Sequence, residues 1–138
     1  MTFSDFLKSG SVRKSSRDVQ LARSLLTTAH EDLAFLDTVP LDEKAARKMM
    51  SNYYDTLRAI VEAMAVLDGY KVYSHEAFTF YLKEKGESLA AEKYDRFRRI
   101  RNRINYYGQN ISVAEVAEHA EGIQKLIRTL TEAYLKDL

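Results

Sequence analysis

The chain has no cysteine, a single proline and only five glycines among its 138 residues. Without cysteine it can form neither disulfides nor thiolate ligands for zinc, and thiolate catalysis is excluded as well. Because breaks in regular structure are few, the elements between them should be long. No apolar run approaches the length of about 18 residues that a membrane-spanning helix needs, and Met1–Gly10 lacks the apolar core of a signal peptide. We therefore expect a cytoplasmic protein with no membrane contact.

Charge is nearly balanced over the chain as a whole. Lysine and arginine number 21 against 20 aspartates and glutamates, which gives a net charge of +1 and no overall bias toward nucleic acid. Apolar residues make up 46% of the chain, close to the average of globular proteins. A chain of this length can bury one hydrophobic core, and no repeat or low-complexity run divides it. The sequence therefore predicts a single domain over residues 1–138.

Apolar residues recur at steps of three and four along most of the chain, which is the pattern of amphipathic helices, and strand signals are absent. Gly69 and Gly108 each end a predicted helix, and Ser112 with Glu115 forms a capping box. We expect an all-α fold, an antiparallel up-and-down bundle of four to five helices, with its core in about residues 15–137 and a short turn within residues 1–14. The expected helices run from Ser15 or Ser16 to Leu36, from about Asp42 to Asp68, from Ser74 to Gly86, from about Ala90 to Tyr107, and from Ser112 to about Tyr134.

The densest feature is the segment Arg96–Gly108, which begins with five arginines within eight residues. Apolar residues at helical spacing predict a buried stripe on the same helix: Tyr94, Phe97, Ile100, Ile104 and Tyr107. A guanidinium group binds phosphate through a planar fork of donors and stays charged at any relevant pH. One interpretation is therefore a phosphate-binding face in which Arg98, Arg99 and Arg103 contact nucleic acid. The other is a solvated face whose arginines pair with acidic residues elsewhere.

The three histidines are scattered, and none forms the short-spaced pair of a metal-binding helix. We expect no metal site and no cofactor, and neither a glycine-rich phosphate loop nor a nucleophile elbow is present. His75 falls in the first turn of its predicted helix, where a histidine can contact the end of a neighbouring helix. The adjacent pair Tyr53–Tyr54 places one tyrosine in the core and one at an interface or site. Tyr54 and His75 are thus further candidate site residues.

Three segments in order along the chain resemble the HEPN domain, a nucleotide-binding domain of higher eukaryotes and prokaryotes. They are Tyr53–Tyr70, Ser74–Ala77 and Arg98–Tyr106, and the resemblance covers about residues 15–137. A helix with a tyrosine pair ends in Gly-Tyr, a Ser-His-Glu-Ala helix start follows, and an Arg-Asn helix end precedes the last helix. The resemblance implies a helical bundle that dimerises. In many members it also implies a ribonuclease that needs no metal, and several members are toxins or defence proteins.

The family signature is an arginine, a polar residue, three further residues and a histidine. Here Arg101 takes the arginine position and Asn102 the polar position, while the histidine position falls on Tyr106. A branch of the family ends its motif in Asp-Tyr where this chain has Asn105–Tyr106. By the resemblance, Arg101 would stabilise the charge of the transition state, and Asn102 would position the ribose or hold Arg101 in place. Tyr106 would orient a 2′-hydroxyl or a phosphate, because tyrosine ordinarily titrates near about pH 10 and is a poor base at neutral pH.

Five positions along an ideal helix separate Arg101 and Tyr106 by about 140°. We therefore expect these two side chains to converge poorly within one helix. Convergence would need either unwinding of the helix before Gly108 or a second subunit across a two-fold axis. The dimer of the HEPN family supplies the second arrangement.

The first functional hypothesis is an RNA- or nucleotide-binding homodimer with paired copies of Arg101. It is either an active or a lapsed metal-independent ribonuclease of toxin–antitoxin or defence type. A basic cleft lined by Arg98, Arg101 and Asn102 would support it. A further hypothesis is a helical dimer without chemistry, whose arginines only form ion pairs.

The alternative function implied by the resemblance is that of a non-catalytic helical dimer, the partner of a small nucleotidyltransferase. Tyr106 or Tyr107 would then accept a transferred nucleotide, although the acceptor tyrosine of the family aligns with Gly108. A flat apolar patch away from the arginines would support this reading.

Overall fold

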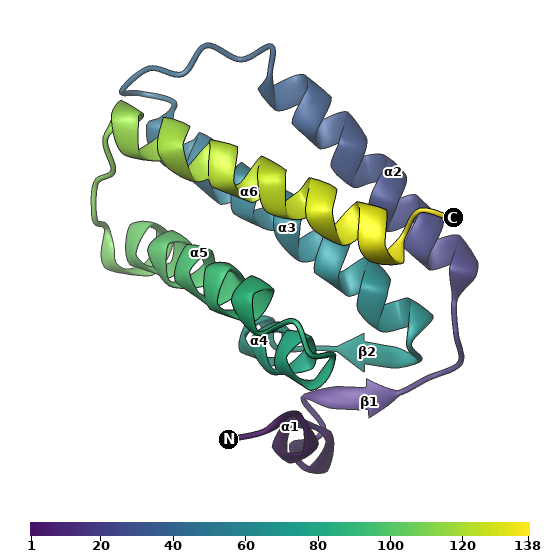
Figure 1. Ribbon diagram of the computed structural model, residues 1–138. Helices are drawn as coiled ribbons and strands as arrows, with labels where there is room; N and C mark the ends of the chain where they lie inside the picture. Colours follow the sequence, from purple (N-terminus) through teal and green to yellow (C-terminus); the bar gives the residue numbers. More distant parts are fainter.

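The computed structural model describes residues 1–138 as six helices and one pair of short strands. The four longest helices, α2, α3, α5 and α6, alternate in direction along the chain. They form an antiparallel bundle with α3 at its centre (Figure 1). The predicted all-α bundle is confirmed, with six helices rather than four to five. The elements are α1 (Phe3–Ser9), β1 (Val12–Lys14), α2 (Val19–Leu36), α3 (Ala46–Leu67), β2 (Tyr70–Val72), α4 (His75–Glu84), α5 (Ser88–Tyr107) and α6 (Val113–Tyr134).

The core is built around α3, which contacts α2, α4, α5 and α6. Its apolar residues cover most of its circumference, and Met50, Leu57 and Ile60 are fully buried. A helix that is apolar on nearly all sides must lie inside the bundle, because each exposed apolar side chain would forgo about 1.5–3 kcal/mol of burial. None of the helices combines the length and the apolar character that crossing a membrane requires.

The strand pair was not predicted from the sequence. β1 and β2 are antiparallel, with Val12 opposite Val72 and Lys14 opposite Tyr70. Each strand has only three residues, too few to show an alternating pattern. The pair holds α1 and the N-terminal segment against the end of α3, where the Ser15 amide donates to the Gly69 carbonyl over 2.7 Å. Gly69 has φ of 84°, and a Cβ there would lie 2.9 Å from the Ser15 carbonyl oxygen, so this position requires glycine.

Most predicted helix ends are confirmed, and two starts were wrong. Gly108 ends α5 in the left-handed conformation, and Ser112 caps α6 with the reciprocal Glu115 bond. The first long helix begins at Val19 rather than after Ser15 or Ser16. The two serines belong to the connection between β1 and this helix, and the Asp18 side chain caps the helix. Likewise α3 begins at Ala46, because the Asp42 side chain accepts from the Ala45 amide and closes a separate turn first.

Candidate functional site

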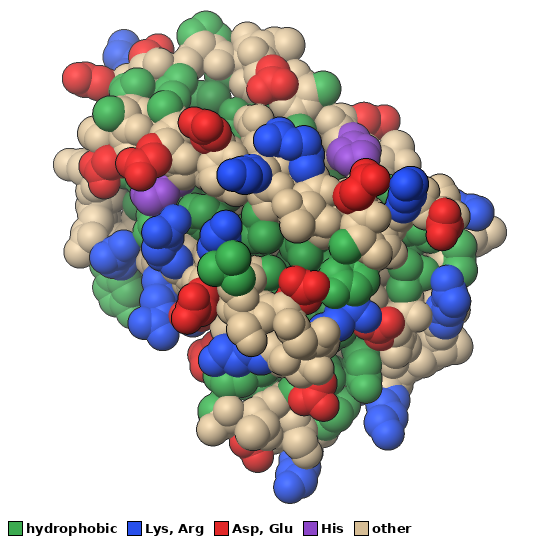
Figure 2. Space-filling view, in the orientation of Figure 1, with side chains coloured by type: hydrophobic (Ala, Val, Ile, Leu, Met, Phe, Trp, Pro, Cys, Tyr) green, Lys and Arg blue, Asp and Glu red, His purple; other side chains and the backbone are tan.

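The arginines of α5 lie on two flanks of a buried stripe. Tyr94, Phe97, Ile100 and Ile104 are buried as predicted. Tyr107 is not: its side chain is 76% exposed, because α5 stops there and no element covers its last turn. In Figure 2 basic side chains gather at the left, over the C-terminal half of α5. The arginines of this helix nevertheless differ strongly in their surroundings.

Arg101 lies on the flank of α5 that faces α3, with its side chain only 15% exposed. Its guanidinium carbon is 5.6 Å from the ring centroids of both Tyr54 and Tyr106. Nη1 donates to the Tyr106 hydroxyl over 3.2 Å, and Nη2 lies 3.8 Å from Asp55 Oδ1. The Nε atom is buried without a hydrogen-bond partner. Two cation–π contacts and one long ion pair therefore hold the group without closely neutralising its charge.

The contact between Arg101 and Tyr106 overturns the expectation that they converge poorly within one helix. α5 remains helical to Tyr107, so no unwinding is involved. Both side chains are long, and helical side chains lean toward the N-terminus, which carries the Tyr106 ring back over the preceding turn. The two groups meet within one chain, and no second subunit is needed for this pair.

His75, the first residue of α4, lies beside Tyr54, the buried tyrosine that Arg101 contacts. The His75 ring centroid is 5.9 Å from that of Tyr54. The buried Tyr54 hydroxyl is 2.8 Å from the Tyr94 hydroxyl, which in turn donates to the backbone carbonyl of His75 over 2.9 Å. This chain of hydroxyls ties α3, α5 and the start of α4 together. Burial raises the pKa values of Tyr54 and Tyr94, so both stay protonated donors at neutral pH.

The pKa of His75 lies below its ordinary value. Partial burial is the largest cause, and the positive charges of Arg58, Arg101 and Arg98 add to it. The Asp55 carboxylate opposes the shift without cancelling it. The His75 imidazole is therefore predominantly neutral at pH 7, in a field set by arginines.

Arg58, on α3, was missed by the sequence reasoning. It lies one turn after Tyr54 on the same helix, 3.5 Å from Glu62, and its Nε is buried without a partner. The available signal was the i, i+4 spacing, which places Arg58 on the face of α3 that carries Tyr54. We call the assembled group the Arg101 cluster; its members are Tyr54, Asp55, Arg58, His75, Arg101 and Tyr106.

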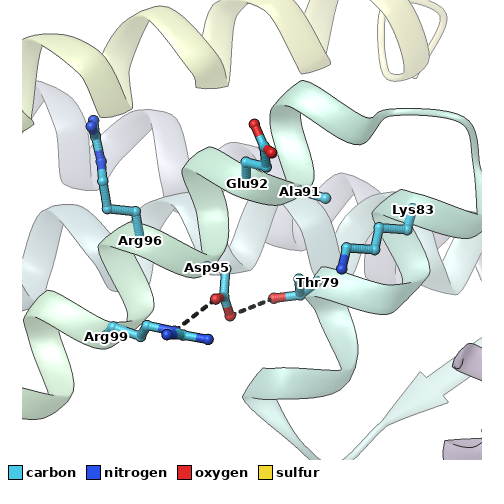
Figure 3. Close-up of a pocket in the computed structure, with 7 residues that line it drawn as sticks. All are labelled: Thr79, Lys83, Ala91, Glu92, Asp95, Arg96 and Arg99. Atoms are coloured by element: carbon cyan, nitrogen blue, oxygen red, sulfur yellow. Dashed lines mark hydrogen bonds and ion pairs between the residues drawn. The ribbon is translucent and has the colours of Figure 1, made fainter. Parts of the chain in front are cut away.

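Arg98 and Arg99 share one carboxylate, that of Asp95. Figure 3 shows this carboxylate with two of its partners, Arg99 and Thr79. Arg98 donates twice to Oδ1, over 3.2 and 2.9 Å, and Arg99 Nε lies 2.8 Å from Oδ2. The Thr79 hydroxyl also donates to Oδ1, over 3.1 Å. Burial raises the pKa of Asp95, but the hydrogen bond and charge of Arg98 outweigh it, and the pKa lies below its ordinary value. Asp95 is thus a fixed anion that neutralises part of the basic face.

The other flank of α5 carries arginines without an ion pair. Arg96 lies over the Phe97 ring, 5.3 Å from its centroid, and neither Arg96 nor Arg103 lies within ion-pair distance of a carboxylate. An open hollow of about 430 Å³ runs along this flank. We call it the outer hollow; it is lined by Arg96, Arg99, Asn102, Arg103 and Tyr107. The five arginines of the segment therefore have only two carboxylate partners, Asp55 and Asp95, so most of their positive charge is not neutralised by ion pairs.

The sequence-derived candidates thus fall into two groups. Asn102 lines the outer hollow and makes no hydrogen bond to Arg101, so it does not hold that side chain within the chain. Asn105 lies toward α3, where its amide oxygen accepts from the Ser51 hydroxyl over 2.8 Å. Arg98 lies on the same flank of α5 as Arg101 and is held by Asp95. No three His, Asp or Glu side chains come close enough together to hold a metal ion.

A comparison of the chain with models of protein families, with curated proteins and with solved structures finds no match. The geometry of the Arg101 cluster is therefore the basis for assigning a function.

Proposed function

We propose that this chain binds RNA and cleaves its backbone without a metal ion, with the Arg101 cluster as the reacting centre. The observation that carries the proposal is the state of Arg101: a largely buried guanidinium, oriented by two tyrosine rings, with one carboxylate no nearer than 3.8 Å. A preorganised, weakly neutralised guanidinium is suited to the negative charge that develops on phosphate oxygens during transesterification.

The excess of arginine over carboxylate on α5 favours RNA binding over a purely structural role. If the arginines only formed ion pairs, each would be expected to have a nearby carboxylate, yet Arg96 and Arg103 have none in ion-pair contact. Exposed Tyr106 and Tyr107 add aromatic surfaces beside these charges. Basic grooves with adjoining aromatic rings suit single-stranded RNA, whose bases stack on such rings.

The resemblance to the HEPN family supports the same reading, with Arg101, Asn102 and Tyr106 in its motif positions. It extends the proposal to a homodimer of toxin–antitoxin or defence type. A cytoplasmic location is part of the proposal, and the absence of cysteine fits a reducing compartment.

The test is cleavage of a mixed pool of single-stranded RNA in the presence of EDTA. The wild-type chain should release products with 2′,3′-cyclic phosphate and 5′-hydroxyl ends, and Arg101→Ala should release them at least about a hundredfold more slowly. Arg23→Ala, an exposed arginine on α2 remote in sequence from the cluster, is the matched control and should cleave as the wild type does. Circular dichroism checks that each variant is folded. An inactive wild-type chain would reject the catalytic proposal.

A second candidate function rests on the exposure of two tyrosines. Tyr106 and Tyr107 are 68% and 76% exposed, and the Tyr107 hydroxyl makes no hydrogen bond, whereas that of Tyr106 accepts one from Arg101. This favours the alternative of a partner whose tyrosines accept a nucleotide from a small nucleotidyltransferase. Intact-mass and peptide mass spectrometry of the protein from its native cells tests it. An added nucleoside monophosphate on either tyrosine would support this function, and unmodified tyrosines in every sample would reject it.

A further inference from the structure

We propose that His75 is the general base of the reaction, taking the proton from the ribose 2′-hydroxyl at the Arg101 cluster. This inference rests on the proposed function. The 2′-oxygen forms a bond to phosphorus as its proton passes to the imidazole, and the bond from phosphorus to the 5′-oxygen breaks. The leaving 5′-oxygen takes a proton from solvent, and His75 later returns its own proton to solvent. No metal, oxidant or other co-reactant is required.

The placement of His75 is the first argument. The Tyr54 ring contacts both the His75 ring and the Arg101 guanidinium. It therefore links the proposed base to the arginine that would bind the phosphate. Tyr54 is itself fully buried and tied through its hydroxyl to Tyr94. A rigid ring that contacts a base on one helix and a phosphate-binding arginine on another sets their spacing, which proton abstraction at a bound phosphodiester requires.

The freedom of the imidazole is the second argument. The hydrogen bond that His75 receives, from Tyr94, goes to its backbone carbonyl. This bond fixes the start of α4 and leaves both ring nitrogens without a protein partner. His75 is exposed at the surface, so its ring can reach a bound ribose. The position that the HEPN motif gives to histidine holds Tyr106, whose hydroxyl is already engaged by Arg101.

The charges around His75 are the third argument. α3 presents Arg58 and Asp55, α5 presents Arg98 and Arg101, and Glu76 follows on its own helix. Burial and the arginines together lower the pKa of His75, so the ring is neutral at pH 7 and able to accept a proton. A bound phosphate would offset the arginine charges and favour the protonated ring that forms as the reaction proceeds.

The other two histidines do not share this placement. His119, on α6, packs edge-on against Phe97 with centroids 5.8 Å apart, beside the outer hollow rather than the Arg101 cluster. His30 lies exposed on α2. These residues provide matched controls, because each can be replaced by glutamine without touching Tyr54 or Arg101.

The first experiment is cleavage of a short single-stranded RNA in EDTA, with rates measured from about pH 5 to pH 9. His75→Gln should lower the rate at pH 7 by about 10²-fold or more and remove the acidic limb of the pH profile. RNA affinity, measured by fluorescence anisotropy, should stay within about threefold of the wild type. His30→Gln and His119→Gln should keep both the rate and the pH profile. Imidazole added to His75→Ala should restore part of the rate, which a purely structural role would not allow.

A second experiment does not depend on turnover. The His75 ring proton signals are assigned by NMR through the loss of signal in His75→Gln, and their titration is followed with and without inorganic phosphate. Phosphate should raise the pKa of His75 in the wild type and leave it unchanged in Arg101→Ala. Absence of this shift would mean that anions do not bind beside His75, and it would overturn the inference.

The outcomes of the cleavage experiment are distinguishable. If the wild type cleaves RNA, Arg101→Ala cleaves it far more slowly, and His75→Gln cleaves at the wild-type rate with the same pH profile, the inference about His75 fails and the proposed function stands. If His75→Gln loses RNA affinity along with rate and imidazole restores nothing, His75 is structural and the inference again fails. If the wild type cleaves nothing, both proposals fall.

Discussion

Two sets of arginines from one eight-residue stretch of α5 have different surroundings. On the inner flank, the side chains of Arg98 and Arg101 are 13% and 15% exposed and are held by Asp95, by Asp55 and by tyrosine rings. On the outer flank, Arg96 and Arg103 are exposed and have no carboxylate within ion-pair distance. The same residue type thus supplies a fixed guanidinium on one flank and free positive charge on the other.

This difference separates two tasks within the proposed function. A free, hydrated arginine attracts RNA at long range, and its effect falls with salt. A largely buried arginine with fixed orientation can act on one phosphate, because little reorganisation is needed when charge develops. We therefore expect inner-flank substitutions to change rate and outer-flank substitutions to change affinity.

The largest effect is expected from Arg101→Ala. It should lower kcat for RNA cleavage by about 10²- to 10³-fold, as loss of a preorganised charge-stabilising group does in known enzymes. Arg101→Lys should restore little, because an ammonium group has neither the planar fork nor the stacking surface that Tyr54 and Tyr106 contact. Single-turnover rates at saturating RNA provide the measurement. A rate for Arg101→Ala within tenfold of Arg103→Ala would remove the distinction between the flanks.

Asp95→Asn should convert a held arginine into a free one. It removes the anion that Arg98 and Arg99 share, so RNA affinity should rise severalfold as unpaired charge is gained. Stability should fall by about 1–2 kcal/mol, because Asp95 is 20% exposed and its ion pairs are partly screened. Urea denaturation and anisotropy measure the two effects. Glu92→Gln, at an exposed residue of the same helix without an ion pair, is the charge-matched control.

Because the pKa of Asp95 is lowered in the folded chain, its contribution has a definite pH dependence. The contribution is present above the ordinary carboxyl pKa of 3.8 and is lost as pH falls through the lower, folded value. The stability difference between wild type and Asp95→Asn should therefore shrink below about pH 4. A difference that stays constant to pH 2.5 or so would contradict the ion-pair explanation.

On the outer flank we expect smaller, additive effects. Arg96→Ala and Arg103→Ala should each weaken RNA binding by about threefold at moderate salt and reduce the slope of log K against log salt by about 0.7. Neither should change kcat by more than about twofold. Anisotropy titrations at several KCl concentrations give the slopes. Equal slopes for wild type and Arg103→Ala would place the RNA away from the outer hollow.

The helices could be predicted from the sequence because their signals are local. The apolar spacing of three and four, Gly69, Gly108 and the Ser112–Glu115 capping box each act within a few residues, and the structure has them as expected. The β1–β2 pair joins segments far apart in sequence that have three residues each. Its strands are specified by where α3 ends rather than by their own pattern, so no local signal was available.

Most members of the Arg101 cluster could be predicted from the sequence, but their arrangement could not. Arg101, Tyr54 and His75 were candidates from the sequence, yet nothing local indicated that one tyrosine ring would contact both of the others. The predicted separation of Arg101 and Tyr106 was wrong because long side chains do not point straight out from the helix axis; they bend back along the helix and can meet. Arg58 was missed because its only signal in the sequence is the i, i+4 spacing to Tyr54, which does not show that packing leaves its Nε buried.

The smallest expected effect is on the pH dependence of stability, and it comes from the two histidines on either side of α5. His75, on the inner flank, and His119, beside the outer hollow, both have pKa values lowered mainly by burial and then by arginine charge. Near and below the ordinary histidine pKa of 6.5, the unfolded chain therefore binds more protons than the folded chain. The free energy of unfolding should decline as pH falls through this value.

Replacing either histidine by glutamine should flatten this decline between about pH 7 and pH 5, each by well under 1 kcal/mol because both rings are partly solvated. Thermal melts across this range measure the effect, with His30→Gln as the control. At about 0.5 M KCl the flattening by His119→Gln should shrink more than that by His75→Gln, since the Arg96 charge beside His119 is exposed and screened, whereas Arg101 is largely buried. An equal response of the two variants to salt would mean that the flanks of α5 differ in packing but not in their electrostatic environment.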